Sequence, residues 1–169
     1  MENAIMMHRR SLLIGSTLTA AVAATGAAQA GGLFGLFGDD APQGAVYAQD
    51  GVAIRGTDPV AYFTEGKPVA GSAEHALTWG GTTWHFASAE NRAKFEADPA
   101  AFAPQYGGYC AWAVAEKGEL FSTDPSAWAI VDGKLYLNYN ASIQDRWNKD
   151  IPGFIAEGDR RWPEIVQGS

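Results

Sequence analysis

TTWHFASAENRAKFEADPAAFAPQYGGYCAWAV, residues 82–114, contains the sequence signals that decide the fold. Its first five residues are β-formers that directly follow a Gly-Gly pair, which is typical of a hairpin. Ser88 stands where a helix N-cap is expected, and the helix over residues 89–97 is predicted to end before Asp98-Pro99. Two further short helices are expected before the stretch ends. A strand followed closely by helices indicates a mixed fold.

Outward from this stretch, three two-residue turns that end in glycine mark hairpins, at Asp50-Gly51, Gly80-Gly81 and Asp132-Gly133. Such pairs supply the positive φ angles that type I′ turns require. In the third hairpin, a two-residue turn pairs Trp128 with Leu137, which places four apolar side chains of residues 128–137 on one face. The opposite face carries alanine, valine, lysine and tyrosine.

The same construction in the second hairpin pairs Leu77 with Trp84 and His75 with Phe86. His75 then ends the apolar face of the hairpin, whereas His85 points to the opposite, polar face. With a two-residue turn, the two histidines therefore cannot bind one ion together.

Helices are also predicted outside these hairpins. Asp58-Pro59 opens a short one, Asn140 caps another, and Pro152 begins a last helix that Pro163 is expected to stop. We therefore predict an α+β fold with a small antiparallel sheet built from hairpins and short helices packed on one face.

The N-terminal segment is interpreted as a targeting sequence. Arg9-Arg10 precede an apolar stretch that ends at Ala28-Gln29-Ala30, a pattern suited to signal peptidase. The paired arginines indicate the twin-arginine type, and Sec export stays open. We thus expect a signal peptide over residues 1–30, a flexible glycine-rich leader over 31–45 and a single domain over 46–169, in the periplasm or secreted.

Charge excludes some classes of partner. The chain has 12 lysines and arginines against 19 aspartates and glutamates, a formal net charge of −7. Nucleic-acid binding proteins carry basic patches, so no nucleic acid is expected as a partner. The apolar part of the signal is short for a membrane span, and no stable span is expected after cleavage.

The helix junction in the opening stretch resembles that of the YHS-domain family, and of its exported bacterial branch in particular. Members with metal-type motifs have Phe-Cys-Ser-x-x-Cys there, followed by a helix that ends near Asp-Pro. Phe86, Ser88 and Asp98-Pro99 hold that frame, as do Lys94 and Phe95, while Ala87 and Asn91 stand in place of the two cysteines.

The resemblance extends over residues 46–162 and implies a YHS-like domain with a metal-handling ancestry. A structural zinc site needs four ligands, usually cysteine and histidine, and both frame cysteines are gone. The residues themselves therefore predict a domain that folds without metal.

Cys110 is the only cysteine of the chain, and it follows two glycines among aromatic residues. It has three interpretations: a small buried core residue, a ligand-facing thiol in an aromatic pocket with Tyr109 and Trp112, or a reactive nucleophile or redox thiol. As a metal ligand it would pair with His75, which is preferred to His85 because it ends the apolar face.

We accordingly predict an exported YHS-like module that binds a small ligand or metal ion near Cys110, with binding preferred over catalysis. The candidate site comprises Cys110, His75, Tyr109 and Trp112, with Cys110 and His75 as ligands of weakly held copper or zinc. One alternative is a thiol-dependent enzyme or redox protein that uses Cys110 with a histidine. Another is a structural or protein-binding module.

Overall fold

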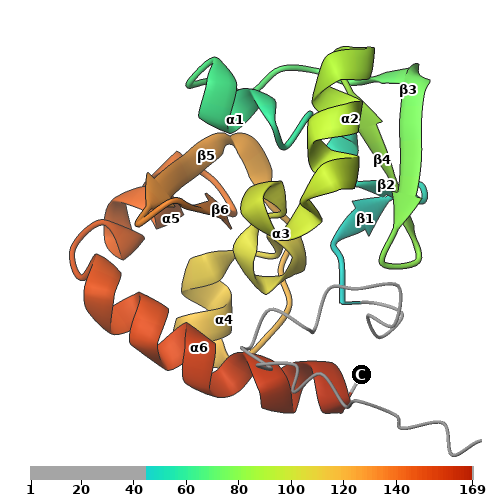
Figure 1. The fold of residues 1–169 in the computed structure, drawn as a ribbon. Coiled ribbons are helices and arrows are strands. Elements are labelled where there is room, and N and C mark those ends of the chain that lie inside the picture. Colours follow the sequence, from blue (N-terminus) through green and yellow to red (C-terminus); the bar gives the residue numbers. More distant parts are fainter. Residues whose placement is uncertain (1–44, 169) are drawn as a thin grey trace, which may run out of the picture. The chain divides into compact units, whose positions relative to one another are not determined.

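The computed structural model describes residues 45–168 (Figure 1). The signal expected over residues 1–30 and the leader expected over 31–45 lie outside this range, apart from Ala45. Within the range, every helix falls short of the length and apolar character that a membrane span requires. The elements are, in order, β1 (Ala48–Gln49), β2 (Val52–Ala53), the 3₁₀ turn η2 (Ile54–Gly56), α1 (Ala61–Thr64), β3 (Ser72–Trp79), β4 (Thr82–Phe86), α2 (Ala89–Ala97), α3 (Pro99–Phe102), the 3₁₀ turn η3 (Gln105–Gly108), α4 (Ala111–Lys117), β5 (Asp124–Val131), β6 (Lys134–Asn138), α5 (Ala141–Trp147) and α6 (Ile151–Gln167).

All three glycine turns form the predicted hairpins, β1–β2, β3–β4 and β5–β6. Both residues of each turn have positive φ, for example 53° and 79° at Asp50-Gly51 and 50° and 75° at Asp132-Gly133. These are the angles of type I′ turns, whose twist matches that of the flanking strands. Local sequence is therefore sufficient to place the three hairpin turns.

The α+β class is confirmed, although the strands form two sheets rather than one. The larger sheet has the order β1-β2-β4-β3, and β5-β6 stand apart. β2 and β4 run parallel, with Val52 opposite Thr83. Parallel strands need a long connection, and η2, α1 and β3 provide it here. The larger sheet is consequently mixed rather than antiparallel throughout.

The register of β3 differs from the prediction at its first half. Leu77 pairs with Trp84 as expected, but Phe86 pairs with Ser72 and not with His75, across an irregularity in the strand. The reason is a close approach: a Cβ on Gly71 would lie 2.5 Å from the backbone carbonyl of His85. Because glycine allows this contact, the residue of β3 that pairs with Phe86 at the end of β4 is Ser72, three residues earlier in the sequence than the His75 of a regular hairpin.

The β5–β6 hairpin separates two apolar cores. Leu135 and Leu137 belong to the first core with the aromatic residues of β4 and α2, and Tyr136 belongs to the second core with Trp147 and Trp162. The predicted alternation of faces is thus confirmed. Helices lie on both sides as a result: α2 packs on the β3–β4 hairpin, whereas α6 packs along α4 (Figure 1).

Two predicted caps are confirmed, and one predicted helix end is wrong. The side chains of Ser88 and Asn140 accept the capping hydrogen bonds of α2 and α5. α6 continues through Pro163 to Gln167 instead of stopping there. Proline removes one helical hydrogen bond, but Trp162 and Val166 on either side are buried in the second core, which favours continuation of the helix past Pro163.

Candidate functional site

A left-handed turn before Cys110 determines the position of this residue in the fold. Tyr106, Gly107 and Gly108 have φ angles of 53°, 60° and 81°. A Cβ on Gly107 would lie 1.7 Å from the carbonyl oxygen of Ala45, and one on Gly108 would lie 2.5 Å from Ile54 Cγ2. Only glycine fits at both positions. The pair therefore permits the close approach that its sequence suggested.

The turn delivers Cys110 to the edge of β6. The residue forms an isolated bridge with Leu137, and its backbone N–H donates to the carbonyl oxygen of Phe121 at 3.0 Å. Cys110 is also the N-cap residue of α4 and is 0% exposed. The thiol is therefore buried at the start of a helix.

A side-chain amide, that of Asn138, lies beside the Cys110 thiol. Cys110 Sγ donates to Asn138 Oδ1 at 3.6 Å, and the backbone N–H of Trp112 donates to the same oxygen at 3.0 Å. Asn138 Nδ2 donates in turn to Gln144 Oε1 at 2.7 Å, which fixes the orientation of the amide. The amide oxygen thus faces the sulfur.

Burial raises the pKa of the Cys110 thiol above its ordinary value, and nearby backbone N–H groups, such as that of Ala113, offset only part of this rise. The amide oxygen of Asn138 acts in the same direction as burial, because it accepts a hydrogen bond from the neutral thiol and would repel a thiolate. Cys110 is consequently a neutral thiol at physiological pH.

A cavity of about 230 Å³ lies over this thiol. Phe121 and Tyr139 form one wall, with ring centroids 6.4 Å apart and an edge-on arrangement, and both rings are partly exposed, at 37% and 47%. The cavity therefore has flat apolar sides and opens to solvent. Its lining residues are Cys110, Trp112, Ala113, Lys117, Phe121, Tyr139 and Ile143.

Two cations accompany the aromatic walls. Lys117 Nζ lies 5.3 Å from the ring centroid of Phe121 and 6.0 Å from that of Trp112. Arg146 Cζ lies 5.8 Å from the Trp112 ring centroid. Cation–π contacts of this length stabilise each charge while leaving its hydrogen-bond donors available. The site can thus receive an apolar ring together with a negative group.

A second polar centre, which the sequence analysis missed, is the carboxylate of Asp58. Asp58 is 0% exposed, and Oδ1 accepts from the backbone N–H groups of Val60 and Ala61 at 2.8 and 3.3 Å. Oδ2 accepts from Ala87 N at 2.8 Å and Asn91 Nδ2 at 2.7 Å. The carboxylate therefore joins the start of α1 to the junction of β4 and α2.

Comparison with known proteins finds a family match that includes hydrogen-bond donors of this centre, Ala87 and Asn91 among them, but not Asp58 itself. The YHS domain family model matches residues 60–106. The match covers α1 to the start of the turn before Cys110, which is less than half of the chain, and it stops short of Cys110 itself. No curated protein and no solved structure shows a significant match.

Two residues within the YHS match, Ala87 and Asn91, contact this carboxylate. Ala87 donates through its backbone N–H and Asn91 through its side-chain amide, both to Asp58 Oδ2, so the carboxylate links the end of β4 to α2. The Asp58-Pro59 pair was the available signal. It predicted only a helix cap, because the partner at position 91 lies far away in sequence.

The residues near Cys110 do not fit a closed metal site. The polar side-chain atom next to the sulfur is an amide oxygen, which is a weak ligand for copper or zinc. In the part of the chain that the structure describes, no three histidine, cysteine or acidic residues gather as metal ligands. No metal chemistry is therefore assigned to this centre.

The cavity brings together two of the four predicted site residues, Cys110 and Trp112. The ring of Tyr109 lies instead against Tyr47 and Trp162, with centroids 5.6 and 6.4 Å away. His75 lies in β3 and is absent from the lining. The sequence analysis missed five lining residues: Ala113 and Lys117 of α4, Phe121 after it, Tyr139 after β6 and Ile143 of α5.

Proposed function

We propose that residues 46–169 form a non-catalytic module that binds a small ligand in the cavity beside Cys110. The observation that supports this proposal is the cavity itself, with aromatic walls over a buried thiol. Its volume of about 230 Å³ is below the roughly 300–1,000 Å³ typical of sites for drug-sized molecules. A ligand with a single ring is therefore the appropriate size.

The charge of Lys117 favours an anionic ligand. Lys117 lines the cavity and lies over the Phe121 ring, and a carboxylate can accept its hydrogen bonds while the ring of the ligand stacks on Phe121 or Tyr139. We therefore propose a small aromatic carboxylate as the class of ligand.

The alternative of a thiol-dependent enzyme is disfavoured by the chemistry of the thiol. A nucleophilic cysteine needs a lowered pKa, whereas burial raises the pKa of Cys110. Among the residues of the range 45–168 that line the cavity, none is a histidine that would serve as a base. Both observations favour binding over catalysis.

Benzoate and benzamide provide a matched test, because they share shape and differ in charge. We expect benzoate to shift the NMR resonances of Trp112 and Ala113 in a saturable way, and to bind more tightly than benzamide. Lys117→Gln should remove this preference, while Lys149→Gln, an exposed lysine outside the cavity, should leave it intact. Shifts that avoid the cavity residues with both compounds would exclude the proposal.

We propose that any binding of copper or zinc is weak and that Cys110→Ser abolishes it. The YHS match supports testing it, and the surroundings of Cys110 favour a low affinity. Elemental analysis that finds one metal ion retained per chain, with unfolding on chelation, would contradict this expectation.

Export is proposed on the sequence of the first 30 residues. Sequencing the N-terminus of the protein recovered from the periplasm should yield Gly31 as the first residue, from cleavage after Ala30. Recovery of the chain with residues 12–24 still attached would exclude cleavage at this site.

A further inference from the structure

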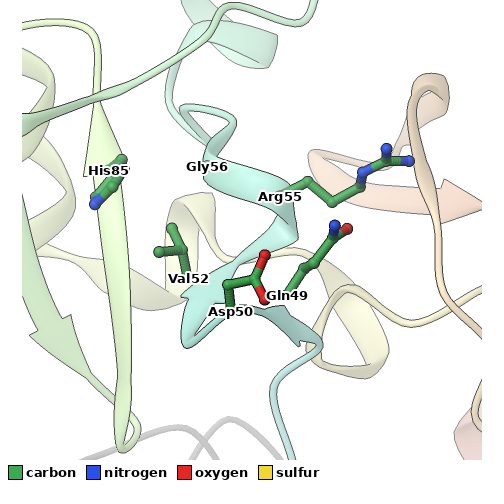
Figure 2. A pocket seen from close by; sticks show the side chains of 6 residues that line it. All are labelled: Gln49, Asp50, Val52, Arg55, Gly56 and His85. Atoms are coloured by element: carbon green, nitrogen blue, oxygen red, sulfur yellow. The ribbon is translucent and has the colours of Figure 1, made fainter.

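A second cleft, of about 380 Å³, lies between the β1–β2 turn, η2 and β4. Figure 2 shows Gln49, Asp50 and Arg55 together on one side of Val52, and His85 on the other side. The floor between these ends consists of Val52 and Gly56. None of these residues lines the cavity at Cys110, so the cleft is a separate feature.

Arg55, which lines this cleft, lies in a segment with an uncommon backbone conformation. Ile54, Arg55 and Gly56 have φ angles of 40°, 59° and 76°. A β-branched residue with positive φ is rare, and each such non-glycine residue costs on the order of 1 kcal/mol or more. The Ile54 side chain is buried in the first core, which anchors the turn and directs the neighbouring Arg55 outward.

The polar side chains at the cleft make no hydrogen bonds to other residues of the range 45–168. In that range Arg92, Arg160 and Arg161 each pair with a glutamate, whereas Arg55 forms no ion pair within 4.0 Å. The charge of Arg55 reaches Asp124, but Asp124 accepts its hydrogen bonds from Ser126, at 2.7 and 2.8 Å. The donors of the Arg55 guanidinium are therefore available to a ligand.

The cleft offers a positive and a negative group on the same side. A guanidinium binds a carboxylate through two parallel hydrogen bonds, and Gln49 adds an amide donor. Asp50, next to them, would repel a simple anion and attract an ammonium group. A simple cation would bind Asp50 but make no favourable contact with Arg55. Only a ligand that carries both charges can pair with Asp50 and Arg55 together.

We propose that this cleft binds a free α-amino acid, with the ligand carboxylate on Arg55 and its ammonium group on Asp50. The ligand side chain then runs over Val52 toward His85, whose imidazole can donate or accept a hydrogen bond. An amino acid with a polar side chain, such as glutamine, fits both ends.

The test uses L-glutamine and two capped forms, N-acetyl-L-glutamine without the ammonium group and L-glutaminamide without the carboxylate. We expect L-glutamine to shift the NMR resonances of Val52, Gly56 and His85 in a saturable way. Each capped form should bind about tenfold more weakly, the loss expected for one charge-assisted hydrogen-bonded contact.

Two variants and two controls complete the design. Asp50→Asn and Arg55→Gln should each weaken L-glutamine binding by about tenfold. Asparagine is favoured at the positive φ of position 50, so the hairpin is retained. Asp132→Asn makes the same change in the turn of the third hairpin, and Cys110→Ser alters the other site; both should leave binding unchanged.

If N-acetyl-L-glutamine binds as tightly as L-glutamine, the proposal is overturned, because the site would then recognise the carboxylate without the ammonium group. Equal effects of Asp50→Asn and Asp132→Asn would overturn it as well, since binding would not depend on the charge in the cleft. An absence of shifts at the highest soluble concentration would also overturn it.

Discussion

Replacing Asp58 by alanine is expected to destabilise the domain more than any other substitution of an aspartate in residues 45–168. The carboxylate is fully buried, and it accepts four hydrogen bonds that tie α1 to the β4–α2 junction. None of the salt bridges in the described range involves it, so backbone and amide donors alone stabilise its charge.

The loss in the free energy of unfolding expected for Asp58→Ala follows from the two long-range hydrogen bonds of the carboxylate. A hydrogen bond to a charged group contributes about 1.5–3 kcal/mol, and the bonds from Ala87 and Asn91 are both short, at 2.8 and 2.7 Å. Together they correspond to about 3–6 kcal/mol. Because burial of the carboxylate offsets part of this, we expect a loss of about 4 kcal/mol in the free energy of unfolding.

Asp58→Asn provides an intermediate case. Each carboxylate oxygen accepts two of the four hydrogen bonds, so the amide nitrogen of asparagine must face two donors at whichever position it takes. About half of the stabilisation, roughly 2 kcal/mol, should therefore be lost.

Asp98→Ala is the matched control, since Asp98 also precedes a proline and caps a short helix but is exposed. Loss of an exposed cap costs about 1 kcal/mol. Urea-induced unfolding measured by tryptophan fluorescence gives the three free energies. If Asp58→Ala costs no more than Asp98→Ala, the reasoning from buried hydrogen bonds is refuted.

Three further outcomes are expected. Near neutral pH, Cys110 in the folded protein should react with a disulfide reagent far more slowly than Cys110 in the urea-unfolded chain, because burial raises the pKa of the thiol. Equal rates in the two states would contradict the burial of Cys110. Gly158→Ala should cost about 1–3 kcal/mol, since the added Cβ would lie 2.5 Å from the Tyr106 hydroxyl oxygen and 2.7 Å from the ring carbon Cζ. The cost should fall in part in a Tyr106→Phe background, and strict additivity in unfolding experiments would exclude a clash with the hydroxyl. Burial raises the pKa of Tyr136 to about 12. The contribution of this shift to stability is therefore complete below the ordinary pKa of about 10 and is lost as the pH rises toward 12. An alkaline absorbance titration of wild type against Tyr136→Phe that finds ionisation of Tyr136 near pH 10 would contradict the raised pKa.

The predictable part of the fold consists of features that neighbouring residues determine. The three turns formed as predicted because Asp-Gly and Gly-Gly pairs adopt positive φ at little cost. Ser88 and Asn140 cap their helices because the donors lie three residues away along the same chain. The faces of the β5–β6 hairpin follow from its turn in the same way, since the register passes along paired strands.

The candidate site was predictable only in its chemistry. The sequence singled out Cys110 and Trp112, an unpaired thiol among aromatic residues, and both line the cavity. His75 was chosen from an extrapolated register, and the contact of Gly71 with the backbone of His85 changed that register. Local rules cannot predict such a contact, because it joins segments that meet only after the chain has folded.

The sequence by itself thus determined the α+β class, the hairpins and the helix caps, each of which depends on residues a few positions apart. Tertiary structure alone decided the parallel pairing of β2 with β4, the burial of Cys110 against Asn138 and the role of Asp58. The physical reason is the same in each case. Burial and hydrogen bonding across 28 to 33 residues, as for Cys110 and Asp58, depend on packing that brings distant segments together.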